Sequence, residues 1–202
     1  MTGPEAGPPP AVHLPPPPAR IEAGPTPVGP LVLERVAGSA VSATVEAVNA
    51  SLQELRPWMP WAGTAATEDS IGAFHHRSEE AWEDGREFQF TMGLATGDPA
   101  DTVVGACGLH TRQGPGVLEI GYWVRTDRTG RGVATAAARA LVGAASSIPG
   151  VHEVQIRCDR DNRASAAVAR RLGFTLVAEV ASPVEAPGES GVSLVWALPV
   201  GR

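Results

Sequence analysis

The sequence contains no lysine, and all sixteen of its basic residues are arginines. A nucleotide triphosphatase needs a Gly-Lys-Ser/Thr ending in its phosphate-binding loop, so the missing lysine excludes that class. Arginine as the sole basic residue, beside abundant alanine, glycine and proline, indicates a GC-rich genome, and we expect a bacterial source.

Cysteine is also scarce, with only Cys107 and Cys158 in 202 residues. Two cysteines are too few for a disulfide scaffold or a cysteine-based metal site, so we expect two buried, reduced thiols. His75 and His76 lack partner ligands at metal-binding spacing. We therefore expect them on a solvated helix face, and we predict no metal.

No apolar run is long enough to span a bilayer. The N-terminus has proline, glycine and glutamate where a signal peptide would have a basic segment and an apolar stretch, so we expect a cytoplasmic protein without a membrane partner. The net charge of −6 argues against nonspecific nucleic-acid binding, which needs a basic surface. This charge is compatible with a cationic partner, although it says little about one cleft.

The chain suits one domain, and its 43% hydrophobic content suffices for a core. Residues 1–30 contain eleven of the nineteen prolines. Because proline lacks the N–H that helices and sheets need, we expect a disordered or polyproline-like tail there. The globular domain is predicted over residues 31–200.

From Leu31 onward, apolar periodicity and turn residues predict a mixed α/β fold. A loop rich in proline and tryptophan is expected at 56–64. The expected strands are 31–36, 86–95, 102–110, 117–125, 152–158, 174–181 and 191–198, and the expected helices are about 39–54, 66–83, 132–146 and 162–172.

The most informative segment is Glu119–Thr135, where an alternating strand leads into a glycine turn and then an alanine-rich helix. Unpaired N–H groups and the positive end of the helix dipole make such a turn an anion site. Gly130 and Gly132 let the backbone approach a ligand closely, and Arg128 and Arg131 add charge. The segment predicts a phosphate-binding turn.

A dinucleotide-binding fold is one class of protein that contains a turn of this kind. It requires G-x-G-x-x-G early in a domain and an acidic residue after the next strand. The segment Gly130–Thr135 lacks the third glycine. Asp159 could supply the acid, but too little chain follows to complete a doubly wound sheet.

Three motifs, in the correct order, resemble the GNAT superfamily of acyl-CoA-dependent N-acetyltransferases. Gly132-Val-Ala134 completes most of the R/Q-x-x-G-x-G/A signature, with Thr129 at its first position. The segment Asp161–Phe174 resembles the N-x-x-S…K-x-G-F helix of the RimJ/RimL-type branch, with Arg171 in place of lysine. Leu55–Trp61 resembles the tryptophan-rich segment of the same branch.

This resemblance, which covers residues 31–198, implies a mostly antiparallel sheet with two splayed strands that admit coenzyme A. It implies an acetyl-CoA-dependent N-acetyltransferase whose acceptor is a protein N-terminus or a small-molecule amine. Transfer of a longer acyl group such as succinyl, a noncatalytic acyl-CoA sensor and a homodimer stay open. The implied coenzyme-binding residues are Trp123, Val124, Arg125, Thr129, Gly130, Arg131, Gly132, Val133, Ala134, Thr135, Asn162 and Ser165.

Glu119 is the predicted general base. Strand alternation places it on the same sheet face as Gly121 and Trp123, and Gly121 is expected to leave a gap for substrate or water. A carboxylate there can accept the amine proton directly or through water. The alternative is an ordinary solvent-facing strand glutamate.

Asn162 and Ser165 lie one helical turn apart. Asn162 is a good helix N-cap, and the resemblance makes Ser165 the general acid that protonates the leaving thiolate. Related enzymes use a tyrosine from this helix, but the only tyrosine here, Tyr122, belongs to the strand expected at 117–125, so we expect that version to be unavailable.

Apart from Trp123, the tryptophans fall into two groups. Trp58 and Trp61 flank two prolines, and they either form the wall of an acceptor pocket or plug the core beneath it. Trp82 and Trp196 are expected to be packing residues on a helix and on the last strand.

Overall fold

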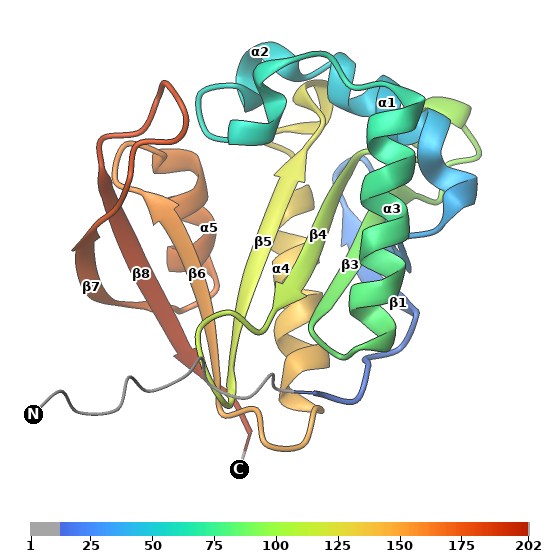
Figure 1. Ribbon diagram of the computed structural model, residues 1–202. Coiled ribbons are helices and arrows are strands. Elements are labelled where there is room, and N and C mark those ends of the chain that lie inside the picture. Colours follow the sequence, from blue (N-terminus) through green and yellow to red (C-terminus); the bar gives the residue numbers. More distant parts are fainter. Residues whose placement is uncertain (1–12, 202) are drawn as a thin grey trace, which may run out of the picture.

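The computed structural model, which describes residues 13–201, contains one eight-stranded sheet in the order β1-β2-β3-β4-β5-β6-β8-β7 (Figure 1). Neighbouring strands are antiparallel except for the parallel pair β5–β6. The predicted mixed α/β, mostly antiparallel fold is therefore confirmed. The strands are β1 (Arg20–Thr26), β2 (Gly29–Arg35), β3 (Glu87–Leu94), β4 (Gly105–His110), β5 (Val117–Val124), β6 (Glu153–Asp159), β7 (Thr175–Ala181) and β8 (Val192–Pro199).

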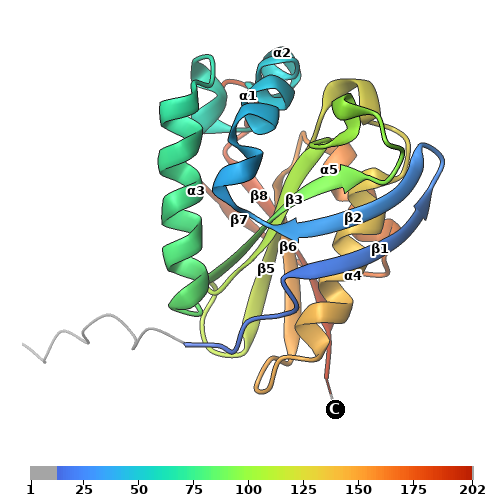
Figure 2. The same ribbon diagram turned by 90° about the vertical axis from the view of Figure 1, so that its right-hand side faces the viewer.

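Helices cover both faces of this sheet. Figure 2 shows α1 and α3 on one side and α4 on the other. Among residues 13–201 no helix is long and apolar enough to cross a membrane. The α-helices are α1 (Val41–Asn49), α2 (Leu52–Leu55), α3 (Glu68–Glu83), α4 (Val133–Ser146) and α5 (Arg163–Arg171), and the short 3₁₀ helices are η1 (Gly38–Ala40), η2 (Pro60–Gly63), η3 (Pro99–Asp101) and η4 (Thr126–Arg128).

The single helix predicted at about 39–54 is broken into η1, α1 and α2. Ser51, at the break, is fully buried and donates its hydroxyl to Ala47 O at 2.8 Å. The same hydroxyl accepts the N–H of Thr126 at 3.0 Å. Because this second bond reaches a segment 75 residues away, local periodicity could not reveal the break.

The core forms where alternating strand residues meet the helices. Phe88 and Phe90 of β3 are fully buried. Trp82 of α3 stands edge-on to both rings, at centroid distances of 5.3 and 5.1 Å. Trp196 and both cysteines are also buried, and the cysteines are unpaired. The predicted packing tryptophans and reduced thiols are therefore confirmed.

The predicted boundary at residue 30 is wrong, because β1 lies within the expected tail. It pairs antiparallel with β2 at the edge of the sheet, where Pro25 needs no N–H donor. Leu14 is 8% exposed in the core cluster, and its N–H donates to Gly85 O at 3.2 Å. Residues 1–12 of the predicted tail lie outside the described residues.

These contacts make the segment before Pro30 part of the folded domain. We expect a chain beginning at Pro30 to melt at least about 5 °C below the full chain, because it loses the Leu14 packing and the β1 ladder. A chain beginning at His13 is the matched control and should keep the midpoint. Equal midpoints for the two shortened chains by thermal denaturation would contradict this assignment.

Candidate active site

The central feature of the site is the point where β5 and β6 separate. Their parallel pairing ends at Ile120↔Ile156, and beyond it β5 continues paired with β4 alone. The gap widens toward the α2 end of the molecule (Figure 1). A cleft of about 1770 Å³ occupies this region, and its lining runs from the N-terminus of α4, through the splay, to the sheet face under η2.

The glycine turn opens α4 at one end of this cleft. Gly130 and Gly132 have left-handed φ angles of 69° and 79°, which favour glycine. The first turn of α4 carries no acidic residue and no side-chain cap. Its leading N–H groups therefore stay available to an anion, as the sequence predicts for this turn.

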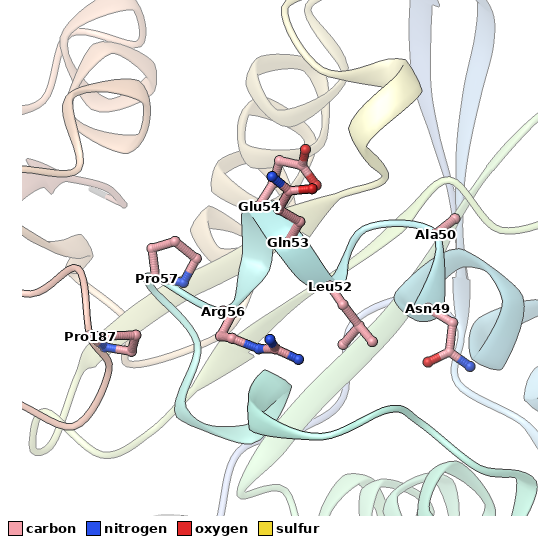
Figure 3. Close-up of a pocket in the computed structure, with 8 residues that line it drawn as sticks. All are labelled: Asn49, Ala50, Leu52, Gln53, Glu54, Arg56, Pro57 and Pro187. Atoms are coloured by element: carbon pink, nitrogen blue, oxygen red, sulfur yellow. The ribbon is translucent and has the colours of Figure 1, made fainter.

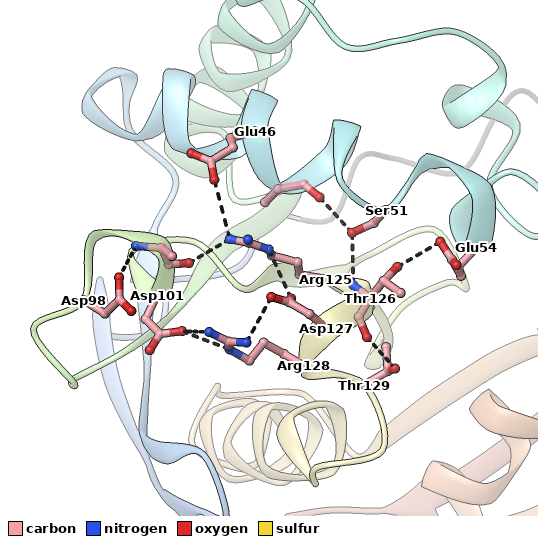
Figure 4. A network of polar contacts seen from close by, with 12 residues as sticks. Glu46, Ser51, Glu54, Asp98, Asp101, Arg125, Thr126, Asp127, Arg128 and Thr129 are labelled. Atoms are coloured by element: carbon pink, nitrogen blue, oxygen red, sulfur yellow. Dashed lines mark hydrogen bonds and ion pairs between the residues drawn. The ribbon is translucent and has the colours of Figure 1, made fainter.

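Two arginines near this turn are occupied by carboxylates (Figure 4). Arg128 donates to Asp101 at 2.8 and 3.0 Å and to Asp127 at 3.0 Å. Arg125 donates to Ala100 O at 2.8 Å and lies 3.1 Å from Asp127. These bonds brace the β5–α4 connection against the loop after β3.

This bracing changes the expected roles of the nearby residues. Burial would raise the pKa of the Asp101 carboxyl, but hydrogen bonds from Thr96 and Arg128 outweigh it and lower that pKa. The Thr129 hydroxyl donates to Thr126 O at 2.8 Å and so stabilises the turn itself. Of the predicted coenzyme-binding residues, all line the cleft except Arg125 and Arg131.

The other side of the splay carries Ser165. Asn162 accepts the N–H of Ser165 at 3.1 Å, so its predicted N-cap role is confirmed. The Tyr122 hydroxyl lies 2.9 Å from Ser165 Oγ and thereby bridges β5 and α5. Burial raises the pKa of Tyr122 to about 12. The one tyrosine, which the sequence analysis set aside, thus reaches the predicted general acid and remains protonated at neutral pH.

Glu119 is only 6% exposed, so the solvent-facing alternative is wrong. Arg112 Nη2 donates to its Oε1 at 2.5 Å and Arg112 Nε to its Oε2 at 3.1 Å. Gln113 Nε2 also donates to Oε2 at 2.5 Å. Three of the roughly four lone-pair positions of the carboxylate are therefore engaged. The Arg112 side chain is 56% exposed and is the solvent-facing partner of this pair.

The gap expected beside Gly121 is filled by His110. An ideal Cβ on Gly121 would lie 3.1 Å from His110 Nε2, a tight contact, so the imidazole lies directly over this glycine. His110 Nδ1 is 3.3 Å from Glu87, and this contact is the main reason that the pKa of Glu87 is lowered. His110 is the strand partner of Glu119 in β4, a relation that sequence spacing alone does not give.

Trp58 and Trp61, in the loop predicted at 56–64, both line the cleft. Trp61 is 50% exposed and meets the Trp123 ring edge-on at 6.1 Å, so it does not plug the core. The N–H of Gly188, in the β7–β8 loop, donates to Pro57 O at 2.9 Å. This bond ties the two loops together above the splay. A separate hollow of about 660 Å³ lies outside that junction, between α2 and Pro187 (Figure 3).

The expectation for the paired histidines of α3 is half wrong. His76 is exposed, but His75 is 2% exposed and its Nδ1–H donates to Ala37 O at 2.9 Å. Burial lowers the pKa of His75. Within residues 13–201, no group of three or more His, Cys, Asp or Glu side chains is arranged to hold a metal ion.

The cleft passes through a splayed sheet and joins the uncapped N-terminus of α4 to the buried carboxylate of Glu119, the arrangement expected of an acyltransferase site. Residues 31–175 match the model of the acetyltransferase (GNAT) domain, so the chain belongs to the GNAT family, whose members use acetyl-CoA as co-substrate. Comparison with curated protein sequences gives no match.

Solved structures of similar fold include Mycobacterium smegmatis RimJ in complex with a CoA disulfide. It shares 24% identity over 93% of this chain and 90% of that one, with a TM-score of 0.81. The Salmonella typhimurium acetyltransferase that modifies the N-terminal serine of ribosomal protein L7/L12 has 19% identity, coverages of 90% and 99%, and a TM-score of 0.74. The microcin C7 self-immunity acetyltransferase MccE, in complex with acetyl-CoA and AMP, has 19% identity, coverages of 89% and 100%, and a TM-score of 0.75. At these identities the likeness shows the fold.

The glycine turn can be tested against a matched glycine elsewhere. We expect Gly132→Ala to weaken acetyl-CoA binding at least about tenfold, because a Cβ intrudes where the phosphates approach the backbone. Gly97→Ala is the control, since Gly97 has a similar φ of 82° with open space around it and does not line the cleft. Both variants should lose about 1 kcal/mol of folding stability. If calorimetry gives equal acetyl-CoA affinities for the two variants, the phosphates do not bind at this turn.

Proposed function

We propose that the protein is an N-acetyltransferase that transfers the acetyl group of acetyl-CoA to a primary amine by direct attack. The observation that carries the proposal is the continuity of one cleft from the α4 N-terminus to Glu119. The co-substrate supplies the activated acyl group as a thioester. The protein must then bind it, orient an amine against it and receive the proton of that amine.

On the coenzyme side, the N–H groups from Gly130 to Thr135 would hold the pyrophosphate. The Trp123 carbonyl faces Gly105 of β4. Because peptide groups alternate along a strand, those of Tyr122 and Val124 point into the splay. These groups would hold the pantetheine arm, and the N–H of Val124 would stabilise the developing oxyanion.

On the acceptor side, Glu119 would receive the proton through its remaining lone pair, directly or by way of a water molecule. Arg112 would orient the carboxylate, and its exposed side chain can move aside when the amine enters. The walls of this half would be Trp58 and Trp61. At the leaving sulfur, Ser165 would donate a proton and regain one from solvent, while the Tyr122 hydroxyl, which burial keeps protonated, would orient Ser165 Oγ.

The acceptor would be a protein N-terminus or a small-molecule amine. Among the solved structures of similar fold, one acetyltransferase modifies the N-terminal serine of ribosomal protein L7/L12, and another gives self-immunity to microcin C7. We further propose a bacterial, cytoplasmic enzyme, with a homodimer as one possible assembly. The competing function is a noncatalytic acyl-CoA sensor, which Thr129 in the first signature position favours. A longer acyl group such as succinyl is the other alternative. Coenzyme binding without turnover on a broad amine panel would favour the sensor.

The role of Glu119 as base is tested by Glu119→Gln. Turnover should fall by about 10²–10⁴ while acetyl-CoA affinity stays nearly constant, because the change removes the proton acceptor and preserves the shape. The loss should shrink as pH rises, since more of the amine is then neutral unaided. Product mass and thiol release over a pH series give the measurement.

Two control variants test whether Glu119 is the general base or only a structural partner of Arg112. Arg112→Gln breaks the same ion pair but keeps the carboxylate, so it should retain far more turnover than Glu119→Gln. Equal losses in the two variants would mean that Glu119 only holds Arg112. His110→Asn tests the neighbouring imidazole, and a large loss confined to this variant would make His110 the proton acceptor.

A further inference from the structure

Almost all acidic side chains that line the cleft accept hydrogen bonds from, or contact, neighbouring groups of the protein. Besides Glu119, Glu87 contacts His110, and Glu54 accepts the Thr126 hydroxyl at 3.0 Å. Asp159 accepts the N–H groups of Asp161 and Ser190, and Glu189 accepts those of Glu185 and Ala186. Glu185 itself is exposed at the rim. These hydrogen bonds fix the carboxylates in place, but Glu54, Asp159, Glu185 and Glu189 have no basic side chain within 4.0 Å among residues 13–201 and keep their negative charge.

Some arginines of the cleft are unpaired in the same way. Four arginines that line the cleft have no carboxylate within 4.0 Å among residues 13–201. Arg139 and Arg171 belong to α4 and α5, on the side where the coenzyme phosphates are expected. Arg77 is exposed on α3. Only Arg157 is half-buried and lies in the sheet itself.

Arg157 sits at the mouth of the splay. It directly follows Ile156, the last residue of β6 that pairs with β5. It shares a sheet face with Gln155, which is the register partner of Glu119. The acceptor amine must reach this same point, because the splay is where the two halves of the cleft meet.

The polar contacts of Arg157 leave its charge uncompensated. Nη1 donates to Gln113 Oε1 at 2.7 Å and to Gln155 Oε1 at 3.5 Å, and both acceptors are neutral amides. Gln113 in turn donates to Glu119. Among the described residues, Nε and Nη2 of Arg157 have no hydrogen-bond partner. Two donor nitrogens of a planar guanidinium thus remain for a ligand beside the proposed base.

We infer that Arg157 binds an anionic group of the acceptor, a carboxylate or a phosphate carried close to the reacting amine. This inference rests on the proposed function and adds the substrate class. A guanidinium offers two parallel donors that match a carboxylate or a phosphate, and it repels a second cation at the same place. The local charge therefore opposes the cationic acceptor with which the net charge of −6 is compatible.

The rival role for Arg157 is structural, because its bond to Gln113 helps to hold the loop between β4 and β5. The two roles differ in one observable. A structural residue affects all acceptors alike, whereas a binding residue affects only those that carry the anion. The test must therefore compare matched acceptors, and it should not depend on turnover.

Bisubstrate compounds allow such a comparison without turnover. In each compound, an acetyl unit joins the sulfur of CoA to the amine of an acceptor. Three matched pairs are used: Gly-Asp-amide against Gly-Asn-amide, Gly-phosphoserine-amide against Gly-Ser-amide, and glycine against glycinamide. Calorimetry gives the Kd of each for the wild type, Arg157→Gln and Arg77→Gln. The pairs separate a side-chain carboxylate, a phosphate and an α-carboxylate as the source of the anion.

We expect the wild type to bind the anionic member of at least one pair about tenfold or more tightly than its neutral partner. Arg157→Gln should abolish that preference without weakening the neutral compounds, and Arg77→Gln should keep it. The inference is overturned if no pair shows a preference, if the preference survives Arg157→Gln, or if this change weakens both members equally. If the wild type binds neither acetyl-CoA nor any bisubstrate, the proposed function itself fails.

Discussion

The site depends on the end of one strand pairing. β5 and β6 are the only parallel neighbours in the sheet of residues 13–201, and their ladder stops at Ile120↔Ile156. Strands that separate leave unpaired peptide groups, which are costly unless a ligand or solvent satisfies them. In this fold the separation opens a passage between a helix N-terminus and a buried carboxylate, and each functional proposal uses that passage.

Several contacts hold the two halves of the sheet around this passage. The Tyr122–Ser165 hydrogen bond spans it, and the bond between Gly188 and Pro57 joins the loops above it. The ion pairs of Arg125 and Arg128 brace the turn that leads into α4. The arginines around the cleft therefore differ: some brace its frame through ion pairs, and others have no carboxylate within 4.0 Å among residues 13–201.

Much of this could be predicted from sequence because the determinants are local. Strand alternation, the two glycines with positive φ and the Asn162 N-cap each depend on neighbours in the chain. The errors arose where contacts are distant or unusual. The prolines of residues 1–30 led to the prediction of a tail, but β1 tolerates them because it is an edge strand. His75 was expected to be solvated, but it is buried and bonded to Ala37, which is distant in the sequence. The position of the His110 imidazole over Gly121 and the hydrogen bond between Tyr122 and Ser165 join different strands and helices, so residue spacing along the sequence does not predict them.

The most direct test of this account is a crystal structure of the protein with bound acetyl-CoA. The account predicts a pyrophosphate on the N–H groups between Gly130 and Thr135. It also predicts that the acetyl group lies between β5 and β6, within reach of Ser165 and on the way to Glu119. A coenzyme bound outside the splay, or strands that close together beyond Ile120, would contradict it.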